Sequence, residues 1–300
     1  MSFKSIILNN PAYLSINNSN LKIKLINTQE DVLVPIDDIA TILLDNPQIS
    51  ITKEVLSSCS KNNIAIITTD ESHMPCGIML PSYTYFKSSD VLATQLNATE
   101  SLKNKIWQAI IKNKIKNQAR ILHFLNKKGA QELDNLIKYV LVGDKSNTEA
   151  IASRTYFIGL FDKHFNRRDD NIINVFLNYG YAVVRSTLAK SLASKGFNCT
   201  LGIHHSSVLN NFNLVDDLIE PFRALVDYKV YNMIFNDEVN INIPFQREHK
   251  EKLVDIMHES VLLDKGEVRL ITGCDMLVDS LIKAYKNKDA NLILNIEIKK

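Results

Sequence analysis

Cysteine is scarce in this sequence, and its spacing disfavours two common kinds of site. The four cysteines (Cys59, Cys76, Cys199 and Cys274) lie far apart and form no C-x-x-C pair. A structural zinc site and a disulfide framework are therefore both disfavoured. The chain also lacks an apolar run long enough to span a membrane, and its opening residues are too polar for a secretion signal. These absences predict a cytoplasmic protein without membrane contact.

Acidic residues are absent from one long stretch, although the whole chain is nearly balanced at a net charge of +2. Residues 101–128 contain no Asp or Glu but many basic residues: Lys103, Lys105, Lys112, Lys114, Lys116, Arg120, Lys127 and Lys128. A solvated helix face is the alternative, but such a face normally gains stability from pairs of opposite charge. Contact with nucleic-acid phosphates is the use that this pattern favours. Trp107, the single tryptophan, is expected in the core rather than stacked on a base.

The periodicity of apolar residues divides the chain into a β-rich part and a helical part. Three hundred residues with 45% hydrophobic content can bury a large core and favour two domains. Short alternating strands and a hairpin turn at Asn17–Asn20 predict a β domain over residues 1–85. Residues 86–300 have helical spacing. The predicted fold class is α+β, with a small N-terminal β-rich domain followed by a larger all-α domain.

Proline, glycine and capping residues mark the expected boundaries of these elements. Pro75, Gly77 and Pro81 predict a break, and Thr99 is expected to open the longest helix. The further helices are predicted at Gln131–Val142, Asn147–Phe165, Ile172–Lys195, Leu214–Phe235, Arg247–Leu263 and Cys274–Lys286. The segment Leu292–Ile298 fits either a strand or an ordered tail.

The segment from Cys199 to Asp227 has the ligand types of a divalent-metal site. His204 and His205 are followed on an otherwise apolar stretch by three acids: Asp216, Asp217 and Glu220. Imidazole nitrogen suits ions such as Mn²⁺, and carboxylate oxygen accepts a hard ion such as Mg²⁺. At most one of the two histidines is expected to bind metal from this direction, because adjacent side chains diverge. Structural histidines and an acidic solvated face are the alternatives.

Helix geometry separates the three acids. On one helix, Asp217 and Glu220 are three residues apart and share a face, whereas Asp216 points elsewhere. Pro221 disfavours regular helix at Glu220 and predicts a kink that presents this carboxylate.

Glu149 opens another predicted helix. It matches a capping box with Ser146, which would explain the acid without any function. The same helix continues through Arg154-Thr-Tyr-Phe157, and the later segment supplies further ligand types, so a ligand role is the competing hypothesis.

Several ordered motifs together resemble one protein family. In the helical part they are Glu149–Phe157 (Glu-x-x-x-x-Arg-x-Tyr-Phe), Leu177–Ser186, Leu201–His205 and Asp216–Arg223. In the β-rich part they are Pro35–Ile39, Leu44–Asn46, Asn63–Ile67 and His73–Pro81. Across nearly the whole chain, these motifs resemble the CRISPR spacer-acquisition integrases. This is the family of CRISPR-associated protein one, here in the form found in type II systems.

The resemblance implies a metal-dependent DNA endonuclease and integrase that inserts spacer fragments into a CRISPR array by transesterification. It also implies that Glu149, His205 and Glu220 bind Mg²⁺ or Mn²⁺ and carry the catalysis. Many members of the family have Asp where this chain has Glu220, whose longer side chain keeps the ligand chemistry. Asp217 matches an additional acid of some members, and His204 is a further accessory candidate. A hydrolytic nuclease of branched DNA and a non-catalytic DNA-end scaffold are the alternative functions.

The resemblance further implies partners. They are double-stranded DNA (spacer fragment and CRISPR repeat), a second copy of the chain in a homodimer, and the second CRISPR-associated adaptation protein in a heterohexamer-like complex. In type II systems the effector nuclease and an accessory ring protein join them. Residues 1–85 are expected to serve dimerisation and assembly, and residues 86–300 catalysis. The candidate DNA contacts are Lys112, Lys114, Lys116, Arg120, Arg154, Arg185 and Arg223.

Overall fold

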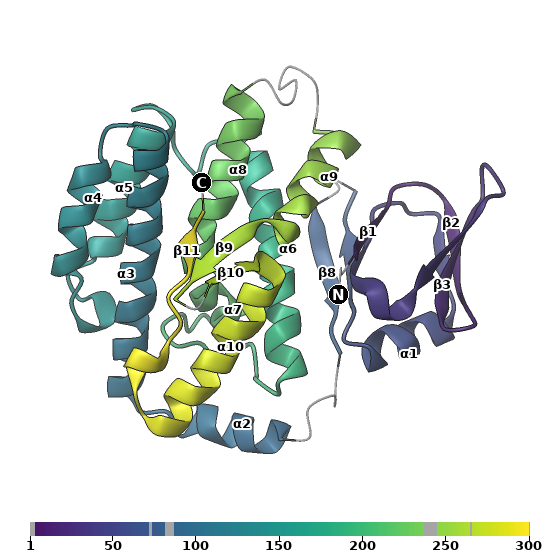
Figure 1. Cartoon of the computed structure of the whole chain (residues 1–300), viewed down its shortest axis with the longest axis horizontal. Helices are drawn as coiled ribbons and strands as arrows, with labels where there is room; N and C mark the ends of the chain where they lie inside the picture. The colour runs from purple at the N-terminus through teal and green to yellow at the C-terminus, as the bar shows by residue number, and fades with distance from the viewer. Residues whose placement is uncertain (1–3, 72–73, 82–86, 237–244, 265, 300) are drawn as a thin grey trace. The chain divides into compact units, whose positions relative to one another are not determined.

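The computed structural model describes residues 4–71, 74–81, 87–236, 245–264 and 266–299. The chain forms two compact units, one of Met1–Ser88 with Ala189–Phe197 and the other of Ser89–Leu188 with Asn198–Lys300 (Figure 1). Strands build most of the first unit, and helices build most of the second. This confirms the predicted α+β class.

The first unit contains two four-stranded sheets, with strand orders β1-β5-β7-β8 and β4-β3-β2-β6. Its elements are β1 (Lys4–Leu8), β2 (Ala12–Asn17), β3 (Asn20–Leu25), β4 (Asp31–Pro35), η1 (Ile36–Asp38), β5 (Ile39–Leu44), β6 (Ile49–Ile51), α1 (Lys53–Lys61), β7 (Ala65–Thr69) and β8 (Pro75–Met79). The predicted hairpin is confirmed, because β2 and β3 pair Asn17 with Asn20. The turn residues Asn18 and Ser19 both have positive φ, as a tight two-residue turn requires.

Strand β8 lies where the sequence predicted a break. It pairs with β7 and, among the described strands, with no other, so it is an edge strand. An edge strand tolerates Pro75, particularly as its first residue. Gly77 allows a close approach, since a Cβ there would lie 2.5 Å from Thr68 Oγ1. The predicted break was therefore wrong at Pro75 and Gly77, and His73 of the same motif lies outside the described residues.

Helix α3 (Glu100–Phe124) is central to the second unit, where it contacts α4, α5 and α8 (Figure 1). Thr99 is confirmed as its N-cap, because its hydroxyl accepts the backbone N–H of Leu102 at 3.3 Å. The other helices are α2 (Ser88–Leu96), α4 (Ala130–Leu136), α5 (Thr148–Leu160), α6 (Ile172–Ser194), α7 (Asn213–Leu218), α8 (Glu220–Phe235), α9 (Arg247–Val254) and α10 (Leu270–Asn287). Short 3₁₀ turns are η2 (Ile137–Tyr139), η3 (Val142–Asp144), η4 (Asp255–His258) and η5 (Ala290–Leu292). No helix within the described ranges is long and apolar enough to cross a membrane.

A small sheet interrupts these helices. Strand β9 (Ser260–Leu263) pairs antiparallel with β10 (Gly266–Arg269) and with β11 (Glu297–Ile298). Residues 86–300 are therefore not the all-α part that the sequence predicted. The helix predicted at Arg247–Leu263 is also wrong in part, because this segment ends as strand β9. Residues of β9 alternate between buried and half-buried positions, with Val261 fully buried, which is the pattern of a strand.

Candidate active site

Glu220 lies at a break between two helices, as the sequence predicted. Helix α7 ends at Leu218, and α8 begins at Glu220 with Pro221 in its first turn. Proline fits a first helical turn because its missing N–H would have no partner there. The Glu220 carboxyl is buried, with 6% of the side chain exposed. Asp217 belongs to α7 and Glu220 to α8, and Ile219 between them keeps helical backbone angles, with φ of −72° and ψ of −21°.

Glu149 lies in the first turn of α5, where another acid caps the helix. Asp144 accepts the backbone N–H of Thr148 and that of Glu149, each at 3.0 Å. Ser146 instead shares a hydrogen bond with the Thr148 hydroxyl at 2.7 Å. The predicted capping box of Ser146 and Glu149 is therefore wrong. Because Asp144 satisfies the helix N-terminus, the Glu149 carboxylate is left for another partner.

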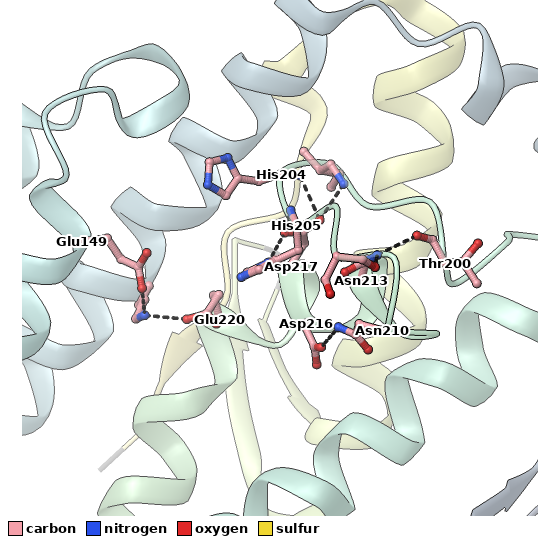
Figure 2. A network of polar contacts seen from close by, with 12 residues as sticks. Glu149, Thr200, His204, His205, Asn210, Asn213, Asp216, Asp217 and Glu220 are labelled. Atoms are coloured by element: carbon pink, nitrogen blue, oxygen red, sulfur yellow. Dashed lines mark hydrogen bonds and ion pairs between the residues drawn. The ribbon is translucent and has the colours of Figure 1, made fainter. Parts of the chain in front are cut away.

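The Lys114 ammonium lies between Glu149 and Glu220, the two glutamates that are labelled in Figure 2. Lys114 Nζ is 2.5 Å from Glu149 Oε1 and 2.6 Å from Glu220 Oε2, and the Lys114 side chain is 7% exposed. Arg223 Nε donates to the other Glu220 oxygen at 2.7 Å. Burial alone would raise the pKa of Glu220, but Arg223 and Lys114 outweigh it and lower this pKa to about 2. Burial would lower the pKa of Lys114, yet Glu220 and Glu149 raise it. Both partners of this ion pair therefore stay charged at neutral pH.

Tyr181 and Asp227 support Arg223 from the core. The Arg223 guanidinium lies over the Tyr181 ring, 4.8 Å from its centroid. The Tyr181 hydroxyl donates to the buried Asp227 carboxylate. Burial raises the pKa of Asp227 to about 6, against the opposing effect of the Tyr181 hydrogen bond. Neither residue was a predicted site residue, although Tyr181 lies within the Leu177–Ser186 motif, which was the available signal.

Asp217 holds the loop that carries both histidines. Its fully buried carboxylate accepts the backbone N–H groups of Ile203, His204 and His205 at 2.5, 3.0 and 3.1 Å. His205 Nδ1 lies 2.7 Å from Asp217 Oδ1 (Figure 2). Because a carboxylate has no hydrogen to give, Nδ1 is the donor, and the neutral ring keeps an unprotonated Nε2. This hydrogen bond is the main cause that raises the pKa of His205, against burial, which lowers it.

Trp107 and Gly202 also hold the histidine loop in place. Trp107 is 1% exposed, which confirms its predicted place in the core. Its ring stacks on His204 with centroids 4.4 Å apart and packs edge-on against His205 at 5.7 Å. At Gly202, a Cβ would lie 2.8 Å from Asp217 Oδ2, so a larger residue would push the loop away from its carboxylate. His204 is therefore fixed by packing, and His205 by its hydrogen bond.

Asp216 turns to a different partner, as predicted. Its two oxygens accept Arg185 Nε and Nη2 at 2.7 and 2.9 Å, and Asn210 donates to it at 2.7 Å. The Arg185 guanidinium also lies over the Phe212 ring at 4.7 Å. This ion pair braces the loop between the histidines and α7.

Comparison with known proteins decides the family. The family model described as CRISPR associated protein Cas1 matches residues 6–263. The chain belongs to the Cas1 family. A curated relative, the CRISPR-associated endonuclease Cas1 of Neisseria meningitidis serogroup C (strain 8013), is 34% identical over 299 residues, which cover 99% of this chain and 97% of the relative. A second, the CRISPR-associated endonuclease Cas1 1 of Saccharolobus solfataricus, is 26% identical over 293 residues, covering 90% and 79%.

Solved structures share the Cas1 fold. A casposase bound to integration product has a TM-score of 0.78 at 18% identity, covering 96% of this chain and 92% of that one. A Cas1 protein from Thermotoga maritima has a TM-score of 0.78 at 16% identity, covering 94% and 97%. A chain of a Cas6-RT-Cas1–Cas2 complex has a TM-score of 0.74 at 17% identity, and its match covers all of this chain but 36% of that one.

In this Cas1 chain, the three predicted metal ligands are brought together only in part. Within the described residues, no group of three or more His, Cys, Asp or Glu side chains is arranged to hold a metal ion. Glu149 and Glu220 do converge on one cation, the Lys114 ammonium, while His205 is held by Asp217. The donors fit a hard divalent ion, because carboxylate oxygens and an imidazole nitrogen are its usual ligands. A carboxylate on the second ring nitrogen is also typical of metal-binding histidines.

Three of the predicted DNA contacts of this Cas1 chain already have carboxylate partners in the site. Arg185 and Arg223 are 36% and 29% exposed and hold Asp216 and Glu220. Lys114 is buried between its two glutamates, so its predicted place on a DNA-facing surface is corrected to one inside the site. The remaining residues of this prediction lie on α3 and α5.

The basic face of α3 is partly neutralised from a distant part of the Cas1 chain. Lys116 and Arg120 both form ion pairs with Glu297 in β11, which supplies the acid that the helix lacks. Lys112 and Lys116 line a groove of about 580 Å³ between α3 and the segment after α10, together with Lys105 and Lys288. No described carboxylate forms an ion pair with Lys105, Lys112 or Lys288. Arg154 is exposed on α5.

Proposed function

We propose that this protein is the strand-joining subunit of CRISPR spacer acquisition, a metal-dependent DNA integrase. The observation that carries the proposal is the convergence of Glu149 and Glu220 on one buried cation, together with a histidine that feels the charge of Glu220 and whose Nδ1 contacts Asp217. The names of the relatives support it, because the Neisseria protein is called a CRISPR-associated endonuclease and the casposase is bound to an integration product.

The site residues have two roles: some would bind the metal ion, and others orient or ionise those ligands. Glu149, Glu220 and His205 would hold Mg²⁺ or Mn²⁺, which supplies polarisation of a phosphoryl oxygen and stabilisation of the departing oxyanion. Arg223 keeps the Glu220 carboxyl ionised, as its pKa of about 2 reflects. Asp217 fixes the proton on His205 Nδ1, so that Nε2 presents its lone pair.

The proposed reaction exchanges one phosphodiester for another. The 3′-hydroxyl of the incoming fragment attacks the phosphorus at the boundary of a CRISPR repeat, and a new P–O3′ bond forms. The P–O3′ bond of the repeat breaks, and its oxygen leaves as a 3′-hydroxyl after taking up a proton. The attacking hydroxyl loses one proton and the departing oxygen gains one. Because one P–O3′ bond replaces another, no external energy source is required. Alignment of the hydroxyl with the scissile phosphate is the main task of the protein.

Two insertion points imply a multi-chain assembly. Both strands of one repeat must be joined, and one chain offers one site. We infer a homodimer assembled through the β-rich part, joined to the second CRISPR-associated adaptation protein. Double-stranded DNA is the substrate, and in a type II system the effector nuclease and an accessory ring protein would take part. The fold likeness to a chain of the Cas6-RT-Cas1–Cas2 complex is in line with such partners.

The deciding experiment blocks the nucleophile. Labelled fragments ending in a 3′-dideoxynucleotide or a 3′-phosphate are expected to bind normally but to join to a repeat-bearing plasmid at background level, because the attacking oxygen is missing or capped. The reaction contains Mn²⁺ and the purified partner, with 3′-hydroxyl fragments as the control. A hydrolytic nuclease would nick the plasmid equally with blocked fragments, and that result would replace the integrase by the alternative nuclease.

The lysine groove is expected to bind DNA phosphates. Replacing both Lys105 and Lys112 with Gln should weaken DNA binding similarly on all sequences and reduce the salt slope by up to about two, since each phosphate contact contributes about 0.9. The measurement is DNA affinity between low and moderate salt by fluorescence anisotropy. Lys103 and Lys128, in the same basic stretch but outside this groove, provide the matched double variant. An unchanged slope in the groove variant would place the DNA elsewhere.

A further inference from the structure

Lys114 occupies the point at which the two glutamates meet. Its Nζ lies 2.5 Å from Glu149 Oε1 and 2.6 Å from Glu220 Oε2. The three residues come from α3, α5 and α8, which are separate helices, so the ammonium is what links these carboxylates across the helical packing. With 7% of its side chain exposed, Lys114 is not a surface lysine that happens to fold inward.

We propose that Lys114 is an internal stand-in for the divalent cation, which a metal ion must displace in order to bind. The proposal rests on the proposed function, in that Glu149 and Glu220 are taken as metal ligands. A divalent ion needs its carboxylate oxygens at about 2.0–2.6 Å. The ammonium nitrogen stands at the same distance from the same two oxygens, so the two cations cannot share this position.

The chemistry of lysine suits a displaceable cation. Its ammonium is a compact point charge on a flexible stem, whereas an arginine is a rigid fork that would be harder to move. Arg223 holds the other oxygen of Glu220, so it can stay in place when Lys114 leaves. Without any cation between them, the buried carboxylate of Glu220 and the half-buried carboxylate of Glu149 would repel each other.

The net charge of the site determines how strongly it attracts a metal ion or a DNA phosphate. In the metal-free protein, Lys114 and Arg223 balance Glu149 and Glu220, so the site attracts a further cation weakly. Exchange of the ammonium for a divalent ion leaves the site one charge more positive, which favours a DNA phosphate. Lys114 therefore lowers the metal affinity of the DNA-free protein.

The test measures Mn²⁺ binding to the full-length, DNA-free protein by titration calorimetry and by the electron paramagnetic resonance of free Mn²⁺. Lys114→Met keeps the length of the side chain and removes the charge. We expect it to bind Mn²⁺ at least tenfold more tightly than the wild type. Its melting temperature should be lower in chelator and should rise more on addition of Mn²⁺. A dissociation constant within twofold of the wild type, or a larger one, would overturn the proposal.

Two sets of control variants separate this proposal from the proposed function. Lys116→Met removes an ion-paired lysine from the same helix, with Glu297 as its partner, and should leave Mn²⁺ affinity unchanged. Glu149→Gln and Glu220→Gln should lose Mn²⁺ binding. If they keep it, the metal site is elsewhere and the proposed function fails. If they lose it while Lys114→Met matches the wild type, the metal site stands and the stand-in role of Lys114 fails.

A measurement on the wild type covers the case in which Lys114→Met does not fold. Acetylation of lysines, followed by peptide mass spectrometry, reports how far each amine is protected. Lys114 should react slowly in chelator and several-fold faster at saturating Mn²⁺, whereas Lys116 should react equally in both. Unchanged protection of Lys114 at saturating Mn²⁺ would show that the ammonium does not move, and this would overturn the proposal.

Discussion

Glutamine in place of Glu220 is expected to reduce strand joining at least a hundredfold while DNA binding is retained. The amide keeps the size of the side chain but removes the charge that faces Lys114 and Arg223. It would also remove one carboxylate from the proposed metal site. Loss of a metal-based contribution of about 3 kcal/mol to the transition state corresponds to a factor of this size. Joining of labelled fragments with Mn²⁺ and the partner measures it, and near-normal joining would exclude Glu220 as a ligand.

The same substitution is expected to destabilise the protein at neutral pH. The folded-state pKa of Glu220, about 2, lies below its ordinary value of 4.5, so the carboxylate stabilises the fold above pH 4.5. This contribution is lost as the pH falls from 4.5 towards 2. A shift of this size corresponds to roughly 3 kcal/mol. The ion pairs with Lys114 and Arg223 therefore outweigh any repulsion between the carboxylates of Glu220 and Glu149.

Urea unfolding at pH 7 and pH 3 measures this effect. The difference in the free energy of unfolding between wild type and Glu220→Gln should be large at pH 7 and much smaller at pH 3. Glu297→Gln is the matched control, because Glu297 also pairs with two basic residues of α3 but is 27% exposed. An exposed pair of this kind contributes less than about 1 kcal/mol. Equal losses in the two variants would contradict a special role for the buried network.

Local signals in the sequence predicted where helices begin, but they identified the capping side chain at only one of the two helices α3 and α5. Thr99 was predicted correctly, because the residue before a helical stripe is the usual cap. At α5 the same reasoning chose Ser146. A left-handed turn at Asn147, with φ of 51°, brings Asp144 to the helix N-terminus instead. Such a turn depends on backbone conformation, which the pattern of residue types does not specify.

The resemblance to the family supplied the candidate ligands, but their surroundings required the fold. Lys114 was assigned to DNA together with its basic neighbours. Lys114 follows Ile110 and Ile111 by four and three residues and so shares their buried stripe on the helix. That spacing predicts burial. It does not predict the carboxylates that balance the charge, since the nearer one, Glu149, is 35 residues away in the chain.

Asparagine in place of Asp217 is expected to keep the fold and to lower metal affinity or joining by roughly a hundredfold. Asp217 does not need to touch the metal to have this effect. It accepts the hydrogen of His205 Nδ1, and carboxylates that hold a metal-binding imidazole in this way are worth about 10–100-fold in metal affinity. An asparagine can present its amide hydrogen to Nδ1 instead, with loss of the one backbone hydrogen bond, from His205, that the same oxygen of Asp217 accepts. The ring proton then moves to Nε2, and no lone pair remains there for a metal ion.

Asp217→Ala makes the matched comparison, because it also removes the acceptor of three backbone N–H groups. Loss of these buried hydrogen bonds should release the histidine loop and cost several kcal/mol in stability. Trp107 is the single tryptophan and stacks on His204, so its fluorescence reports whether the loop is still in place. We expect the asparagine variant to keep the wild-type spectrum and the alanine variant to lose it.

The histidine itself gives the decisive measurement for Asp217→Asn. The hydrogen bond from Asp217 is the main cause of the raised pKa of His205, so its replacement by a neutral amide should move this pKa down towards 6.5. Nuclear magnetic resonance of the imidazole nitrogens would show both the lower pKa and the proton on Nε2. A merely structural acid would change neither. Two results would contradict a positioning role of Asp217. In Asp217→Asn, His205 could keep its raised pKa and its Nδ1 proton. Alternatively, the proton could move to Nε2 while strand joining stayed unaffected.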